Sequence, residues 1–237
     1  MSKFLKMLSI VTIILSFTSC STGVNTEIDN KEKLSYKDCL NYMDSKYGQS
    51  FSLVNDNGVK LTSSFLEVHV QDSLNNVAMA VEELTGNSIV YHDNYIAVKF
   101  DKQLEDFIQP IANESFGKCI VLNEVDFTRY QPDDYNSTTT FEEFKMRSDS
   151  KIYLQVLLPP TYEEKDLNKA LDTFKTSFIN NSIVGTCDIY VCKDDELYNT
   201  IDSTASIANN EKYCIRKYQF RTEIVNGSIN VVGTIED

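Results

Sequence analysis

The residues of this chain that could do chemistry are its cysteines, its histidines and its many carboxylates. Six cysteines and two histidines, His69 and His92, occur among 237 residues. No His-Glu-x-x-His sequence is present, which excludes that class of zinc enzyme. His92 beside Asp93 could form a His–Asp dyad, but we favour a turn that caps a helix. His69 is expected to be exposed, because it lies on the strand face opposite Val68 and Val70.

Several of the carboxylates come as adjacent pairs, which predict a solvated surface in an acidic chain. The pairs are Glu82-Glu83, Asp133-Asp134, Glu142-Glu143, Glu163-Glu164 and Asp194-Asp195. A glycosidase needs two carboxylates opposed across a cleft, and the absence of tryptophan counts against a carbohydrate enzyme. The eight glycines form no Gly-x-Gly-x-x-Gly loop, and no Gly-x-Ser-x-Gly elbow occurs. We therefore predict no catalytic residue, no metal site and no cofactor, and expect a protein that is not an enzyme.

The first twenty residues have the pattern of an export signal. A basic start with Lys3 and Lys6 precedes an apolar run from Met7 to Phe17. As a helix this run would be about 16 Å long at ~1.5 Å per residue, whereas the hydrocarbon core of a bilayer is ~30 Å thick. The run is therefore too short to span the membrane and predicts the apolar region of a signal peptide.

The end of this leader, Phe17-Thr18-Ser19-Cys20, resembles a bacterial lipobox, in which two small residues precede a cysteine. Phe17 departs from the pattern, because Leu is usual there. The resemblance implies cleavage after Ser19, diacylglycerol on the Cys20 sulfur, and anchoring on the extracytoplasmic face of the cell membrane, since two or more acyl chains anchor stably. The alternative is an ordinary secretory leader, which would leave Cys20 as a plain thiol.

Taken whole, the chain resembles uncharacterised lipoproteins of Gram-positive bacteria. The resemblance rests on the leader and on two short motifs, Lys46-Tyr47-Gly48 and Asp93-Asn94-Tyr95. It implies a membrane-anchored protein of the cell envelope and no particular activity.

The charge and the remaining cysteines constrain partners and cross-links. The formal charge is −13, and removal of the two leader lysines makes it −15. This excess of negative charge argues against nucleic acid as a partner and against a basic surface that binds the membrane. Five cysteines remain after Cys20, an odd number, and their pairing is left open: Cys39, Cys119, Cys187, Cys192 and Cys214. Only Cys187 with Cys192 is disfavoured, because an odd separation places them on opposite faces of one strand.

The first half of the chain predicts one helix, a set of strands and a second helix. A helix over 35–47 is indicated by apolar residues at helical spacing, and strands are expected over 65–70 and 88–91. Residues 77–84 fit a helix or a strand, and the turn after them favours the strand. Residues 95–100 fit either a strand after a turn at 92–94 or the start of a helix, and the longer apolar stripe from Ile96 to Ile111 favours the helix. Pro110 should kink or end that helix.

The second half predicts an alternation of strands and helices that closes with a hairpin. Strands are expected over 119–127, 151–158 and 183–192, and helices over 140–147 and 162–181. Residues 194–200 are expected to form a short helix or a turn. Strands 213–225 and 228–235 meet at Asn226-Gly227, a hairpin signal. Tyr130 and Tyr135, in the polar loop 128–139, are the tyrosines that we expect to make exposed contacts.

The predicted fold class is α+β, with a mostly antiparallel sheet or sheets and helices packed on one face. The predicted organisation is a signal peptide over 1–19, a polar tether over 20–33, and two small α+β lobes over 34–127 and 128–237. The tether is rich in Ser, Thr, Gly and Asn, which suits a flexible spacer.

Three functions are weighed. The first is a non-enzymatic envelope lipoprotein, anchored through Cys20, that acts as an interaction or structural module with an unidentified protein partner. The second is a small-ligand-binding lipoprotein such as a transporter accessory, which a pocket with convergent polar groups would favour. The third is a hydrolase, which a pocket that joins His92 to a cysteine, or pairs buried carboxylates, would favour.

Overall fold

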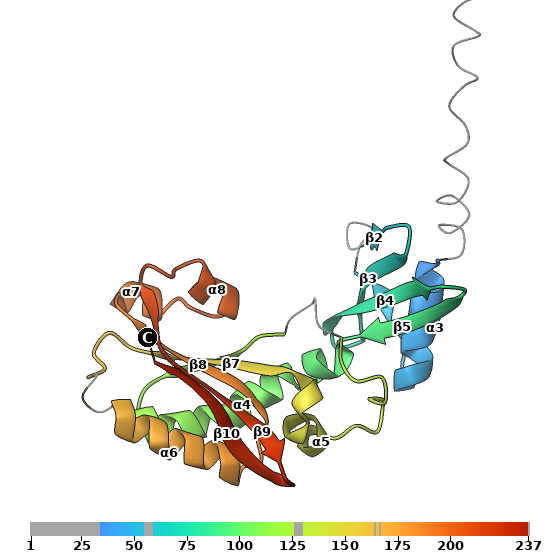
Figure 1. Ribbon diagram of the computed structural model, residues 1–237. Helices are drawn as coiled ribbons and strands as arrows, with labels where there is room; N and C mark the ends of the chain where they lie inside the picture. Colours follow the sequence, from blue (N-terminus) through green and yellow to red (C-terminus); the bar gives the residue numbers. More distant parts are fainter. Residues whose placement is uncertain (1–33, 55–58, 126–129, 164, 166, 237) are drawn as a thin grey trace, which may run out of the picture.

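The computed structural model describes residues 34–236 except 55–58, 126–129, 164 and 166 (Figure 1). The predicted signal peptide, Cys20 and the tether lie outside the described residues. Two sheets and several helices confirm the predicted α+β class. No helix in the described part of the chain is long and apolar enough to cross a membrane.

The first sheet is antiparallel and packs against helix α3 (Tyr36–Tyr47) and the start of helix α4 (Tyr95–Phe116). It contains β1 (Ser52–Leu53), β2 (Val59–Leu61), β3 (Phe65–Gln71), β4 (Val77–Thr85) and β5 (Ser88–Asp93). Helix α3 buries Met43 and Tyr47, and Gly48 ends it at φ +63°. The strand predicted over 77–84 and its hairpin partner are confirmed as β4 and β5.

The second sheet is mixed and has the strand order β10-β9-β8-β7-β6. Its strands are β6 (Ile120–Asn123), β7 (Ile152–Leu158), β8 (Gly185–Cys192), β9 (Cys214–Val225) and β10 (Ser228–Glu236). β7 and β8 are parallel and are joined by α6 (Leu167–Asn180), whereas the other neighbours are antiparallel. The predicted hairpin turn is present, because Asn226 and Gly227 both have positive φ.

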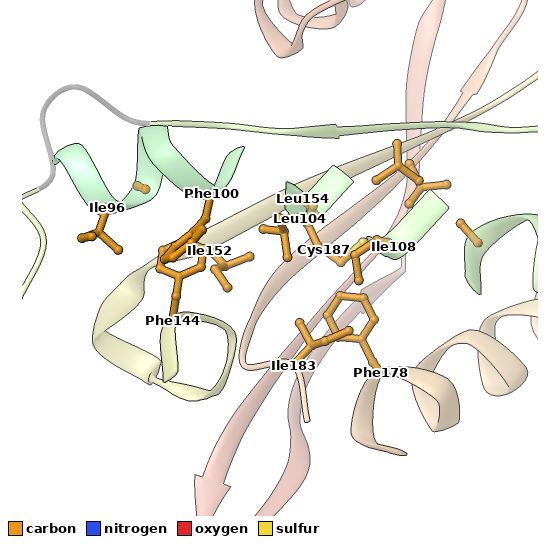
Figure 2. Packing of buried hydrophobic residues seen from close by; sticks show 14 of the residues in the cluster. Ile96, Phe100, Leu104, Ile108, Phe144, Ile152, Leu154, Phe178, Ile183 and Cys187 are labelled. Atoms are coloured by element: carbon orange, nitrogen blue, oxygen red, sulfur yellow. The ribbon is translucent and has the colours of Figure 1, made fainter. Parts of the chain in front are cut away.

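Helix α4 (Tyr95–Phe116) connects the sheets and supplies much of the core. It lies beside α6 on one face of the second sheet (Figure 1). Figure 2 shows Phe100 of α4 against Phe144 of α5 (Phe141–Met146), with ring centroids 5.5 Å apart. The helix predicted over 95–111 is therefore confirmed, and it begins after Asn94 as expected.

Pro110 lies inside α4 and does not end it. Pro110 is exposed, so the backbone carbonyl group that loses its donor lies on the solvent side of the helix. Ala112 and Phe116, beyond the proline, are buried in the same core as Ile108. Burial of this later turn holds the helix together as far as Phe116.

The opposite face of the second sheet, called the outer face below, is covered in part by a smaller unit. Helices α7 (Asp195–Tyr198) and α8 (Thr204–Ala208) lie between β8 and β9 in the chain. Tyr198, Ile201 and Ile207 pack there on Leu157 and Cys192, apart from the main core. The large helices thus lie on one face, as predicted, and this short two-helix segment, residues 193–213, is an addition on the other.

The change from one sheet to the other comes at Asn94, between β5 and α4. The division into lobes at residues 127 and 128 stays a prediction, although this point falls between β6 and β7, which pair in the second sheet. Buried residues of both sheets form one hydrophobic cluster. The loop after β6 also returns to the first sheet, because Gln131 N donates to Asp93 O at 2.8 Å and Ser137 N donates to Lys46 O at 3.3 Å.

Candidate functional site

Polar side chains gather on the outer face of the second sheet, beside the two-helix segment. The register of three central strands brings them together: Gln155 of β7 lies opposite Asp188 of β8, and Asp188 lies opposite Gln219 of β9. Tyr190 lies opposite Arg216 in the same strands. Alternate residues of a strand share a face, so Asp188 and Tyr190 face outward while Cys187 and Ile189 join the main core.

A β-bulge places Arg216 and Gln219 on the same face although they are three residues apart. Ile189 pairs with Tyr218 and Tyr190 pairs with Arg216, so Lys217 is the extra residue of β9. A bulge of this kind reverses the alternation beyond it and redirects the following side chains. Gln219 consequently reaches Asp188, while Tyr218 and Phe220 enter the main core.

Asp188 is the centre of this polar group and its side chain is fully buried. Its carboxylate accepts hydrogen bonds from the Tyr153 hydroxyl, from Gln219 Nε2 at 2.6 Å and from the Tyr190 hydroxyl at 3.3 Å. Arg216 Nη1 lies 3.9 Å from Asp188 Oδ2. A buried carboxylate needs such partners, because leaving it unpaired would cost several kcal/mol.

The tyrosines around Asp188 act as proton donors in hydrogen bonds. Burial, the Asp188 charge and its hydrogen bond raise the pKa of Tyr190 to about 12, against an opposing effect of Arg216. Burial and the same carboxylate also raise the pKa of Tyr153. Both phenols therefore stay protonated at neutral pH and do not supply a general base.

A pocket of about 490 Å³ opens where this polar group meets the two-helix segment. Its lining residues are Gln155, Tyr190, Ile207, Ala208, Glu211, Cys214, Ile215 and Arg216. Gln155 is 6% exposed, and its side-chain oxygen Oε1 is buried without a hydrogen-bond partner. An unpaired buried oxygen costs about 1–3 kcal/mol, so a donor group that reached it from the pocket would gain that free energy.

The His92–Asp93 pair is not a dyad. Asp93 is buried and accepts hydrogen bonds from Tyr42 and Tyr47, while Lys46 Nζ lies 2.8 Å from Oδ2. His92 faces the other way, with Nε2 3.7 Å from Glu83 and Nδ1 3.6 Å from Asp133. Asp93 Oδ1 also accepts from Tyr95 N at 2.9 Å, which forms a turn before α4, while the N-cap residue Asn94 makes no capping hydrogen bond with its side chain.

Other predicted residues lie away from the pocket. Tyr130 is half-buried and stacks on His92 with ring centroids 4.5 Å apart. Tyr135 is buried, because the loop folds its hydroxyl onto Ser150 and its ring against Phe144, so the expected exposed contact is wrong for Tyr135. His69 faces away from Val68 and Val70 as predicted, but it is half-buried rather than exposed.

One predicted surface acid is also internal. Glu82 is fully buried in β4, where its carboxylate accepts from Ser35 N at 2.7 Å and from the Tyr91 hydroxyl at 3.1 Å. Burial, offset in part by these hydrogen bonds, raises the pKa of Glu82. Its neighbour Glu83 is 44% exposed, so the two members of this pair lie on opposite faces of the strand.

The chain offers no metal centre in the part that is described: no group of three or more His, Cys, Asp or Glu side chains there is placed to hold an ion. All five cysteines after Cys20 are buried as free thiols. The pocket itself offers hydrogen-bonding and charged side chains, among them Gln155, Glu211 and Arg216.

The pocket residues were missed in the sequence, although part of a signal was present. Gln155 interrupts an otherwise apolar strand, and Asp188 does the same in β8. Polar residues inside buried strands indicate either a buried network or a site. The Arg216 side chain lies on the outer face because of the bulge at Lys217. The spacing of apolar residues in the sequence does not reveal a bulge.

Comparison with known proteins gave one structural likeness. No family model and no curated relative matches this chain. A solved structure of a DUF5037 family protein from Ruminococcus gnavus ATCC 29149 is similar, with 15% sequence identity and a TM-score of 0.43. The similarity covers 80% of this chain and 91% of that chain.

Proposed function

We propose that this protein is an extracytoplasmic, lipid-anchored binding protein that holds a small zwitterionic ligand in the pocket on its second sheet. The observation that carries the proposal is that Gln155, whose side-chain Oε1 is buried without a hydrogen-bond partner, lines a pocket that also contains charged groups of both signs. Pockets that combine apolar walls with a few convergent polar groups are typical of ligand sites. The role is binding rather than catalysis.

The lining residues specify the class of ligand. Arg216 supplies a cation suited to a carboxylate, Glu211 supplies a carboxylate suited to an ammonium group, and Gln155 Oε1 accepts an N–H. Ile207 and Ile215 add apolar surface on the same pocket. This combination fits a free amino acid with an apolar side chain or a short apolar peptide.

The anchor belongs to the same proposal. The lipobox-like end of the leader places two or more acyl chains on Cys20, which would hold the binding domain at the membrane surface. The charge of −15 after the leader supports a tethered domain, because such a body is repelled by anionic lipid. A ligand-binding domain in that position suits an accessory of a transporter.

Thermal unfolding in the presence of a defined panel tests the binding. The full chain in detergent micelles is heated with leucine, isoleucine, phenylalanine, leucyl-leucine, N-acetylleucine and leucinamide. A ligand at 100 times its Kd stabilises the folded state by about 2.7 kcal/mol, which raises Tm by ~5–10 °C at this size. We expect this shift with one or more zwitterions and a smaller one with the two singly charged compounds.

The outcome that would overturn this proposal is a Tm that no zwitterion in the panel changes. An equal shift with N-acetylleucine would contradict the role of Glu211, since that compound lacks the ammonium group. An equal shift with leucinamide would contradict the role of Arg216, since that compound lacks the carboxylate.

A second candidate is a protein-interaction module, and the observation that favours it is the edge strand β10. Among the described residues β10 pairs only with β9, and it exposes Val232 and Ile235. Exposed strand edges recruit extended segments of other chains. Substitution of Val232 by Lys should then abolish capture of an envelope partner without changing the Tm shift in the ligand panel.

A further inference from the structure

We propose that Cys192 and Cys214 close into a disulfide that fastens the two ends of the two-helix segment beside the pocket. The chain leaves the sheet after Cys192, forms α7 and α8, and returns at Cys214. A bond between them would tie this excursion at its base. This inference concerns a cross-link and stands independently of the ligand.

The register of β8 and β9 places the two cysteines directly opposite each other. Lys193 N donates to Tyr213 O at 2.8 Å, which makes that neighbouring pair a hydrogen-bonded one. Because the two kinds of pair alternate along antiparallel strands, Cys192 and Cys214 form a non-hydrogen-bonded pair, with an expected Cα separation of about 4.5 Å. Disulfides span Cα separations of about 4.4–6.8 Å.

The side chains also share one environment. Cys192 and Cys214 both face outward and belong to the smaller hydrophobic cluster, with exposures of 0% and 2%. The Cys192 side chain is in hydrogen-bonding contact with the Cys214 thiol. Cys192 Sγ in turn lies 3.2 Å from the carbonyl oxygen of Asp194. The two sulfur atoms therefore already face each other in the reduced form.

The other three cysteines do not compete for this bond. Cys39, Cys119 and Cys187 belong to the main core. Cys187 is on the opposite face of β8 from Cys192, as the sequence predicted. One disulfide and three buried thiols therefore account for the odd number of cysteines that follow Cys20.

The reaction is a two-electron oxidation by a small disulfide such as oxidised glutathione. One cysteine thiolate attacks the oxidant and releases one reduced thiol, and the second cysteine then displaces the other. In total two thiols lose two protons and two electrons, and the oxidant is reduced to two thiols. Burial and the neighbouring Cys192 raise the pKa of Cys214 to about 12, so the folded reduced form should react slowly and the bond should form during folding.

The test is to refold the full chain under oxidising conditions and to locate the disulfide. Reduced, unfolded chain is diluted into detergent buffer containing reduced and oxidised glutathione, quenched with acid, alkylated and digested with trypsin. Cleavage after Lys175, Lys193, Lys212 and Arg216 places Cys187 and Cys192 in one peptide and Cys214 in another. Fragmentation of the linked peptides then identifies the bonded sulfur without any variant.

We expect one linked pair of peptides that joins Cys192 to Cys214 in the wild-type chain and in Cys187→Ser. The link should be lost in Cys192→Ser, whose folding is checked by circular dichroism. A chain that refolds with every thiol alkylated would overturn the proposal. So would any other linkage, including one that survives in Cys192→Ser.

Discussion

Gln155 is one of five described residues that bury a side-chain nitrogen or oxygen atom without a hydrogen-bond partner, and it is the one among them that lines the pocket. It lies in the middle of β7 with a buried side-chain oxygen that has no partner. Asp188 next to it is buried as well, but its carboxylate has several donors. Residues that lower the stability of the free protein are typical of binding sites, because a ligand restores the missing interaction.

Substitution of Gln155 by Leu should weaken ligand binding without lowering the stability of the folded protein. The free energy of unfolding should stay the same or rise by up to about 1 kcal/mol, because an unpaired polar group is replaced by an apolar one. Affinity for the zwitterion should fall at least tenfold, which corresponds to about 1.4 kcal/mol. Urea unfolding and ligand titration measure the two effects.

The matched control for this variant is Gln219→Leu. Gln219 Nε2 donates to Asp188 at 2.6 Å, and its loss leaves a buried charge with one partner fewer. We expect a loss of about 1–3 kcal/mol in the free energy of unfolding. If Gln155→Leu were the more destabilising of the two, the interpretation of Gln155 as a ligand contact would be contradicted.

Asp72 should make part of the stability depend on pH. Burial alone would raise the pKa of this carboxyl group, but hydrogen bonds from Asn76, Tyr95 and Leu74 lower it below its ordinary value of 3.8. Unfolded chains then bind the proton more readily than folded ones, so this stabilisation is present above pH 3.8 and is lost as the pH falls through the lower, folded pKa.

The variant Asp72→Asn tests this dependence. At pH 7 it should lower the free energy of unfolding by about 1–3 kcal/mol, because charge-assisted hydrogen bonds are lost. The difference from wild type should shrink between pH 7 and pH 3, as measured by urea unfolding. A difference of the same size at both pH values would show that charge has no part in it.

At the scale of elements, the strands β7 and β8 approach so closely at their start that Gly185 has little room for a side chain. A Cβ atom on Gly185 would lie 2.7 Å from Ile152 O and 2.9 Å from Ile152 Cβ. Gly185→Ala should therefore force the strands apart and lower the free energy of unfolding by about 1–3 kcal/mol.

Gly233→Ala serves as the comparison for that variant, because a Cβ atom at Gly233 meets nothing within 4 Å. It should change the free energy of unfolding by less than about 0.5 kcal/mol. Thermal unfolding of both variants at one pH gives the contrast. Equal losses would mean that the close approach of Ile152 does not limit this position.

Most elements could be predicted because their signals are local. Gly48 ends α3 in the left-handed conformation, Thr140 and Glu143 form a capping box before α5, and Asn226-Gly227 makes the hairpin turn. The site could not be predicted in the same way. The pairing of Gln155 with Asp188 depends on strand order, and the alignment of Arg216 with Gln219 depends on a bulge.

Long-range packing also explains why the helix continues past Pro110 and why Tyr135 is buried. The helix continues past Pro110 because Phe116 is buried in the core, which the local rule for proline does not include. Tyr135 is buried because its polar loop packs onto α5 and Ser150. Both outcomes depend on tertiary packing, which the local sequence around each residue does not reveal.

At the scale of the whole molecule, the two sheets are joined through α4 and through the loop that returns to Asp93. The pocket lies on the second sheet, on the face away from α4 and α6. A lipid anchor on Cys20 would attach to the other end of the chain, before the first sheet. In the sequence, the segment that forms the first sheet thus separates the proposed anchor from the proposed binding site.

Metabolic labelling with a radioactive fatty acid tests the anchor. Wild-type protein should be labelled and should stay with the membrane fraction, whereas Cys20→Ala should carry no label and be released. The physical reason is that only the Cys20 sulfur carries the diacylglycerol in a lipobox of this type. Cys39→Ala is the control and should be labelled like wild type; equal labelling of Cys20→Ala would disprove the lipobox assignment.

The central claim, a zwitterion bound through Arg216, is tested most directly by calorimetric titration of leucine and leucyl-leucine into three forms of the full chain. The forms are wild type, Arg216→Gln and Arg147→Gln, a matched control because the two arginine side chains are 36% and 33% exposed. We predict one-to-one binding of at least one compound, unchanged in Arg147→Gln and weakened at least tenfold in Arg216→Gln. No heat of binding in wild type, or equal affinity in all three forms, would contradict the account.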